Sequence, residues 1–147
     1  MKQFFRNIIA LIFGIIIGSI VNMAIINNAG ALVPPPDGVN PNDIESIKEN
    51  IHLYTPIHFF IPLLAHAMGT FIGALITSLI AVSSRIFLAI GVGCFFLIGG
   101  IMMVMILPAP IWFICLDLIV CYIPMALLGW KFKKIIIIAF ASKTKRK

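Results

Sequence analysis

Long apolar runs separated by short polar segments dominate the pattern of this chain. Four of them, at residues 4–26, 57–82, 86–107 and 111–130, reach the roughly 20 residues that a helix needs to cross a bilayer. The connections at 83–85 and 108–110 are so short that consecutive spans must run antiparallel. The pattern predicts an all-α membrane protein, a single domain over residues 1–147 built as an antiparallel four-helix transmembrane bundle.

The segment at 27–56 is the one long connection, and it predicts a short outer amphipathic helix. Pro34-Pro35-Pro36 is stiff polyproline that leads into a turn. Asn40 is expected to cap the helix, with Pro41 at its first position and Asp43 at its third, near the positive helix end. Apolar residues then recur every three or four positions, at Ile44, Ile47 and Ile51. We expect this apolar face either to lie on the membrane or to cover the mouth of the bundle.

Composition and charge indicate a membrane protein and predict how its spans are oriented. Hydrophobic residues make up 61% of the chain and charged residues 11%, which excludes an ordinary soluble domain. Four of the five acidic residues lie in the segment 27–56. Ten of the eleven Lys and Arg residues lie on the other side of the spans: Lys2, Arg6, Arg85, Lys131, Lys133, Lys134, Lys143, Lys145, Arg146 and Lys147. The positive-inside rule then predicts cytoplasmic N- and C-termini, an outside loop at 27–56 and a basic cytoplasmic tail at 131–147.

The net charge of +6 could also indicate nucleic-acid binding, but the segregation of the charges favours a topology determinant. We expect the tail to lie against anionic lipid, so the lipid bilayer is a predicted partner and nucleic acid is not. A specific lipid or RNA site on the tail is the alternative.

The first span also resembles a signal peptide, because Lys2 and Arg6 precede it and Ala29-Gly30-Ala31 follows it. Its apolar run from residue 8 to 26 exceeds the usual length of about 7–15 residues. Retention of this span also keeps the number of spans even. We therefore expect an uncleaved helix.

Small residues recur four apart in the first two spans. Gly14 and Gly18 have this spacing in the first span, and Gly69 and Gly73 have it in the second. Such residues let helix backbones approach closely, and dispersion packing is what holds helices together in lipid. We expect these faces to pack on each other or on a second copy of the chain.

Three polar residues fall inside spans, where hydrocarbon would penalise them: Asn22, His66 and Asp117. At a helical rise of 1.5 Å per residue they lie about 6, 13 and 9 Å below the outer boundary, on three different helices. Each shares a helix face with small residues or proline, so all three are expected to point inward. Asp117 is the strongest single candidate for a binding residue.

These residues support two hypotheses. In the first, a small polar cavity opens to the outside, and His66 and Asp117 form a proton-exchanging or cation-binding pair, since imidazole titrates near neutrality. In the second, His66, Asp117 and Asn22 hydrogen-bond each other merely to lock the bundle. Intramembrane ionisable groups often mark functional sites.

No cofactor, metal or catalytic residue is predicted. His52, His58 and His66 all lie on the second span or its approach, so histidines on facing helices for haem are lacking. The sequence has no zinc-protease, P-loop or nucleophile-elbow motif. The three cysteines form no Cys-x-x-Cys pair, and we expect them to be buried free thiols: Cys94, Cys115 and Cys121.

Three segments resemble a group of small four-span bacterial inner-membrane proteins without assigned activity. They are GIIIGSIVNMA at 14–24, PPPDGVNPNDIE at 34–45 and YTPIHFFIPLLAHAMGTFIGA at 54–74. The resemblance covers roughly the first half of the chain. It implies a bacterial inner membrane and supplies no catalytic residues.

Three classes of function stay open. The favoured one is an accessory or structural membrane protein, acting as a homo-oligomer or as a subunit of a larger membrane complex, because the chain is small and carries glycine-lined faces. The second is transport of a proton, ion or small solute with His66 and Asp117. The third is an enzyme acting on a lipid or quinone, although the motifs lean against an enzyme.

Overall fold

The computed structural model describes residues 1–144, with side chains described through residue 138. The helices are α1 (Lys2–Asn27), α2 (Ala29–Leu32), α3 (Ile44–Glu49), the 3-10 helix η1 (Ile51–Leu53), α4 (Pro56–Ile80), α5 (Arg85–Ile106), α6 (Ile111–Val120) and α7 (Ile123–Thr144). Four segments are long and apolar enough to cross a membrane, namely Lys2–Leu32, Pro56–Ile80, Arg85–Ile106 and Ile111–Ile138. The predicted all-α bundle is confirmed. Lys145, Arg146 and Lys147 of the predicted tail lie outside the described residues.

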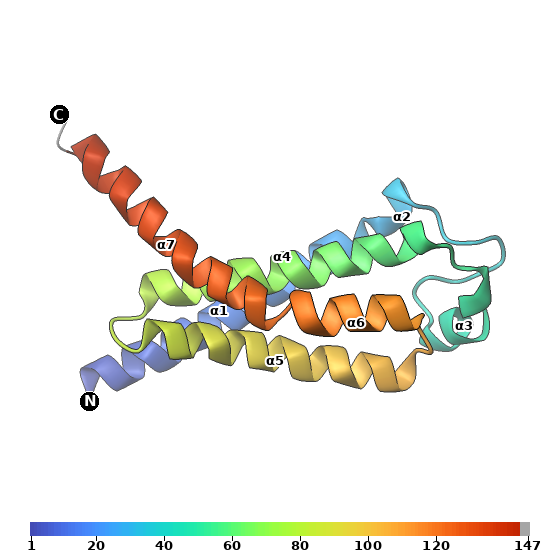
Figure 1. Ribbon diagram of the computed structural model, residues 1–147, viewed down its shortest axis with the longest axis horizontal. Helices are drawn as coiled ribbons and strands as arrows, with labels where there is room; N and C mark the ends of the chain where they lie inside the picture. Colours follow the sequence, from blue (N-terminus) through green and yellow to red (C-terminus); the bar gives the residue numbers. More distant parts are fainter. Residues whose placement is uncertain (145–147) are drawn as a thin grey trace.

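The four spans lie side by side, and the two ends of the bundle differ (Figure 1). The N-terminus and the last turns of α7 lie at one end, here called the terminus end. The connection that contains α2, α3 and η1 lies at the other, here called the loop end. Within the bundle α4 is central, because it packs against α1, α5, α6 and α7.

Glycines set the close approach of α1 and α4. A Cβ atom on Gly18 would lie 2.6 Å from the Gly69 carbonyl oxygen, and one on Gly73 would lie 2.7 Å from the Gly14 carbonyl oxygen. Both distances are too short for a real side chain. The backbones of the two helices are therefore in direct contact, and this contact includes all four glycines of the small-residue pattern.

The terminus end of the bundle is closed by small side chains and local hydrogen bonds. Ala74, Ala89, Val92 and Ala126 form a fully buried cluster between α4, α5 and α7. Next to it, the buried Thr77 hydroxyl donates to the Ala10 carbonyl oxygen at 3.1 Å. Among the described residues, close packing of this kind fills the space between α4, α5 and α7 at this end.

The fourth span is broken, which corrects the single helix predicted over 111–130. The helical hydrogen bonds of α6 end with the one that the Cys121 N–H donates to the Asp117 carbonyl at 3.0 Å. Those of α7 begin with the one that the Ala126 N–H donates to the Tyr122 carbonyl at 2.9 Å. Pro124 has no N–H to donate to the Val120 carbonyl, and its ring crowds that carbonyl. The helix therefore restarts at Ile123 with a new rotational phase.

The outer helix α3 begins at Ile44 rather than after Asn40, which corrects the predicted cap. Asp43 is the N-cap, and its carboxylate accepts from the Glu45 N–H at 3.1 Å. Asn40 instead accepts from the Asn42 N–H at 3.0 Å, so its side chain closes a turn of its own before the helix.

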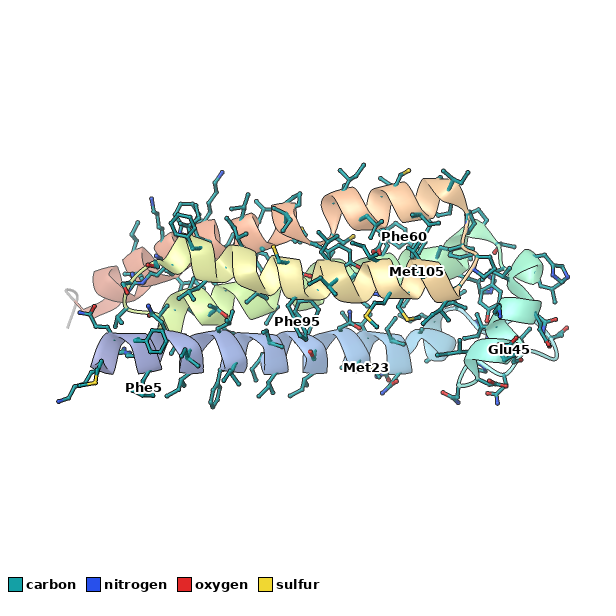
Figure 2. All side chains as sticks on the ribbon, turned by 90° about the horizontal axis from the view of Figure 1, so that it is seen from below. Phe5, Met23, Glu45, Phe60, Phe95 and Met105 are labelled. Atoms are coloured by element: carbon teal, nitrogen blue, oxygen red, sulfur yellow. The ribbon has the colours of Figure 1, made fainter. Side chains whose placement is uncertain are left out.

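Side chains around the bundle are mostly apolar, as Figure 2 shows for Phe5, Phe60, Phe95 and Met105, all of which are exposed. Two cysteines belong to this surface, because Cys94 and Cys115 are exposed and only Cys121 is buried. The prediction of three buried thiols was wrong for the first two. These spans are apolar on every side, so the sequence does not show which helix face points into the bundle. The burial of a small apolar residue such as Cys therefore cannot be predicted from it.

Candidate functional site

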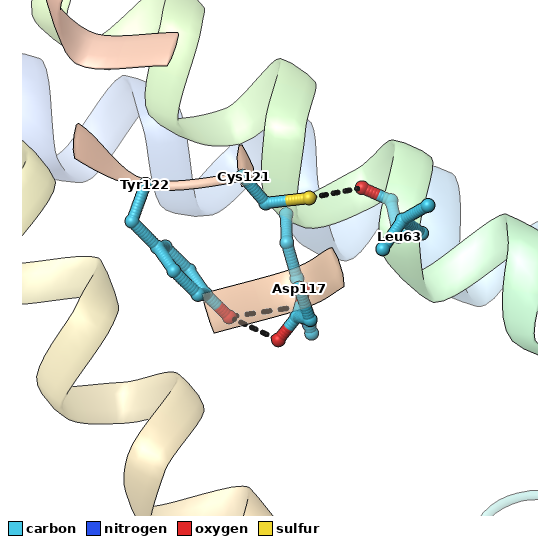
Figure 3. A network of polar contacts seen from close by, with 5 residues as sticks. Leu63, Asp117, Cys121 and Tyr122 are labelled. Atoms are coloured by element: carbon cyan, nitrogen blue, oxygen red, sulfur yellow. Dashed lines mark hydrogen bonds and ion pairs between the residues drawn. The ribbon is translucent and has the colours of Figure 1, made fainter. Parts of the chain in front are cut away.

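Three side chains from α4, α6 and the α6–α7 break form a polar cluster inside the bundle. The His66 Nδ1 atom lies 2.7 Å from Asp117 Oδ1, and the Tyr122 hydroxyl donates to Asp117 Oδ2 at 2.8 Å. The same hydroxyl lies 3.1 Å from His66 Nδ1. Figure 3 shows Tyr122 and Asp117 facing each other across the break. Asp117 and Tyr122 are each 2% exposed, so the carboxylate is held by protein donors rather than by bulk water.

The break in the fourth span places Tyr122 in this cluster. In a continuous helix, five positions at about 100° each would separate the Asp117 and Tyr122 side chains by roughly 140° around the axis. The turn at Cys121 and Tyr122 interrupts the helix, and the Tyr122 hydroxyl lies 2.8 Å from Asp117 Oδ2. Gly100 on α5 supplies the space, because a Cβ atom there would lie 2.6 Å from Tyr122 Cζ and would overlap the hydroxyl.

The hydrogen bonds fix the orientation of the His66 ring. In the tautomer with its hydrogen on Nδ1, the ring donates that hydrogen to the Asp117 carboxylate. The other ring nitrogen, Nε2, has no hydrogen-bond partner among the described residues. Its lone pair is therefore the free proton acceptor of the cluster. His66 is partly exposed and lines two cavities.

Asn22 is the third residue singled out from the sequence, and the structure places it apart from the other two. It lies on α1 and lines the same two cavities as His66. Its amide makes no hydrogen bond to His66 or Asp117 within the described residues. The structure therefore brings His66 and Asp117 together, while Asn22 faces them across open space.

A cavity of about 420 Å³ extends from His66 and Asp117 to the loop end of the bundle. Its walls are mostly apolar and come from α1, α4, α5 and α6. Ile47, Ile51 and Tyr54 roof it. Two residues of the predicted apolar face, Ile47 and Ile51, therefore cover the mouth of the bundle, whereas Ile44 is 48% exposed and does not line the cavity.

His58 attaches this roof to the bundle, a role that the sequence analysis missed. Its Nδ1 accepts from the Thr55 N–H at 3.1 Å and lies 2.9 Å from the Thr55 hydroxyl. Its Nε2 therefore carries the hydrogen and donates to the Pro34 carbonyl at 3.0 Å. The Tyr54 ring packs edge-on against the imidazole, and burial raises the pKa of the Tyr54 phenol, which keeps it neutral. A Thr followed three residues later by Glu or Gln signals a capping box, whereas His at that position does not.

The cluster offers a proton acceptor but neither a metal site nor a nucleophile. No group of three His, Cys, Asp or Glu side chains within the described part of the chain could hold a metal ion. The Cys121 thiol, the nearest nucleophile, is buried and donates to the Leu63 carbonyl at 3.4 Å (Figure 3). The chemistry available is hydrogen bonding and proton exchange at His66 Nε2.

Comparisons of this chain with protein-family models, with curated proteins and with solved structures find no match.

Proposed function

We propose that this protein binds a small ligand at its loop end through a hydrogen bond to His66, a residue that can also exchange a proton. The observation that carries the proposal is the placement of His66, which lines both cavities while Asp117 holds its Nδ1 atom at 2.7 Å. Its Nε2 atom has no hydrogen-bond partner among the described residues. A ring fixed in this way presents one lone pair in one direction, which suits recognition of a single hydrogen-bond donor. The surrounding apolar walls exclude water and strengthen that hydrogen bond.

Binding at one end agrees better with the packing than a continuous pore does. The cavity stops at His66, and the small side chains of the terminus end are closely packed beneath it. Transport by way of His66 and Asp117 would require that packed end to open, and it stays a prediction.

The distribution of charge supports a place in a bacterial inner membrane, with both termini in the cytoplasm and the loop end outside. Lys2, Arg6 and Arg85 lie at the terminus end, whereas the acidic residues of 27–56 lie at the loop end. The resemblance of the first half of the chain to small inner-membrane proteins agrees with this location, and the orientation rests on the charges alone. Ser46→Cys, in a background without the native cysteines, should react with a membrane-impermeant maleimide added to intact cells.

The test of proton exchange is the tautomer of His66. We expect nitrogen-15 spectra of the full chain in lipid nanodiscs to show neutral His66 protonated on Nδ1 and to show Nε2 gaining a proton on acidification. Asp117→Asn should reduce the preference for the Nδ1–H tautomer, because an amide oxygen is a weaker acceptor than a carboxylate. Exposed His52 serves as the control, since it has no partner among the described residues. Neutral His66 protonated on Nε2 would contradict the proposal.

An accessory subunit is the second candidate function. Only 17% of the most apolar stretch of α1 and 22% of that of α5 are buried, which leaves two long apolar faces for lipid, a second copy or partner helices. Extraction at native expression level in mild detergent tests it. A stoichiometric partner protein in the purified material would favour this candidate, and recovery of the chain alone would count against a heteromeric complex.

A further inference from the structure

A second cavity opens beside His66, on the side of the bundle. It holds about 170 Å³ and is lined by Ser19, Asn22, Met23, His66, Phe96, Gly99, Gly100, Met103 and Tyr122. It shares five of these with the larger cavity: Asn22, Met23, His66, Gly100 and Met103. The two cavities therefore meet at His66 and Asn22.

This second cavity opens between α1 and α5, toward the apolar surface of the bundle. The two helices approach each other toward the terminus end, where Leu11 lies 3.6 Å and the Phe96 ring 2.9 Å from Cβ positions built on Gly91 and Gly18. Beyond Phe96, residues of both helices line the cavity. Its rim includes Met23 and Met103, which are 53% and 37% exposed.

Gly99 keeps this rim open. It is exposed, and a Cβ atom built on it would meet no atom within 4 Å. Since the surface around it is the face that a bilayer would cover, the opening connects His66 with the hydrocarbon rather than with water.

The polar groups at the junction favour an uncharged head group. The polar residues that line the smaller cavity are Ser19, Asn22, His66 and Tyr122, and none of its described lining residues is Lys, Arg, Asp or Glu. The larger one adds the buried Asp117 carboxylate and no basic residue except histidine. A phosphate or carboxylate here would face Asp117 without a counter-cation, which is costly in an apolar site. A hydroxyl can donate to Nε2 and accept from the Asn22 amide.

Resting on the binding site proposed above, we propose that the ligand is a membrane amphiphile with a hydroxyl head group, which enters sideways from the bilayer between α1 and α5. The hydroxyl binds at His66 and Asn22. The apolar chain occupies the larger cavity under Ile47 and Ile51, whose volume lies within the usual range for ligand pockets.

Photo-crosslinking of the full chain in nanodiscs tests the ligand class, with hexadecanol carrying a diazirine and an alkyne as the probe. We expect crosslinks on residues that line the two cavities. Asn22→Leu keeps the shape of the side chain and removes the amide, so labelling should fall roughly tenfold, the loss expected for one buried hydrogen bond. The matching palmitic acid probe, which carries a carboxylate, should label the cavities far less. Equal labelling by the two probes would overturn the uncharged head group.

Gly99→Phe tests the route of entry. The side chain has room at the rim and should slow labelling several-fold, whereas Gly30→Phe, equally unobstructed but located in α2, should not. Equal labelling rates in the two variants would overturn lateral entry and would favour entry beneath the roof.

The tautomer of His66 in probe-free protein separates the two proposals. The expected tautomer together with no cavity crosslinks would overturn the amphiphile while leaving the proton-exchange site in place. Cavity crosslinks with neutral His66 protonated on Nε2 would overturn the proposed function itself.

Discussion

His66 Nδ1 and Asp117 Oδ1 lie 2.7 Å apart, although 51 residues separate them in the chain. The contact joins α4 to α6, two helices that otherwise meet mainly through apolar side chains such as Phe59 and Phe113. Breaking either partner would leave a polar group buried without its hydrogen bond. The pair therefore orients the histidine and also holds the first half of the fourth span against the central helix.

Tyr122→Phe should destabilise the bundle by about 1–3 kcal/mol, because it removes the 2.8 Å donor to Asp117 Oδ2 and leaves that oxygen unpaired. Tyr54→Phe is the matched control, since the Tyr54 hydroxyl has no hydrogen-bond partner among the described residues. Reversible unfolding in mixed detergent and SDS micelles measures both. Equal stability of the two variants would mean that the Tyr122 hydroxyl contributes nothing to the cluster.

Gly73→Ala should also destabilise, by about 1–3 kcal/mol, because its methyl group would lie 2.7 Å from the Gly14 carbonyl and force two backbones apart. Gly91→Ala makes the same chemical change in a span, but its methyl group would rest at an ordinary 3.6 Å from Leu11. The same unfolding assay should therefore show no loss for Gly91→Ala. A comparable loss in both variants would refute close backbone contact as the cause.

His58→Ala should loosen the roof over the larger cavity. It removes the acceptor for Thr55 and the donor to the Pro34 carbonyl, contacts of the kind that contribute about 0.5–2 kcal/mol at a helix cap. Hydrogen exchange measured by mass spectrometry should become faster over residues 34–55 and stay unchanged in α5. His52→Ala, an exposed histidine in the same connection, is the control and should leave the exchange of both regions as it is.

The three cysteines should differ in reactivity once the protein is solubilised in mild detergent. A maleimide is then expected to label Cys94 and Cys115, which are exposed, and to spare the buried Cys121. Mass spectrometry of the digested protein measures each site. Rapid labelling of Cys121 would contradict its packing against Leu63.

The spans could be expected from the sequence, because the physical signals are strong. Hydrocarbon penalises polar groups, so His66 and Asp117 were expected to point inward. Their depth and rotational phase permitted a contact between them but did not establish it. Asn22 also had an inward-facing position at a similar depth. Among the described residues, however, its amide makes no hydrogen bond to His66 or Asp117. Depth and phase restrict which side chains can meet but do not determine which of them bond.

Tyr122 could not be expected, because its place depends on a change in helix phase. Pro124 signals that the helix is disturbed, but the rotation between α6 and α7 follows from packing against α4 and α5, including the space that Gly100 leaves. The cap of α3 was misplaced for a related reason. Asn40 and Asp43 are both good capping residues, and the turn that Asn40 closes decides between them.

The break at Cys121 and Tyr122 also divides the molecule mechanically. No continuous ladder of backbone hydrogen bonds connects α6 to α7, so a tilt of α6 need not bend α7, whereas α1 and α4 are clamped together by backbone contact from Gly14 to Gly73. The terminus end is thus a stiff base, and α6 with the roof forms a softer cap on it. We therefore expect ligand binding in the cavity to displace α6 and the roof while the packing of α1 against α4 stays unchanged.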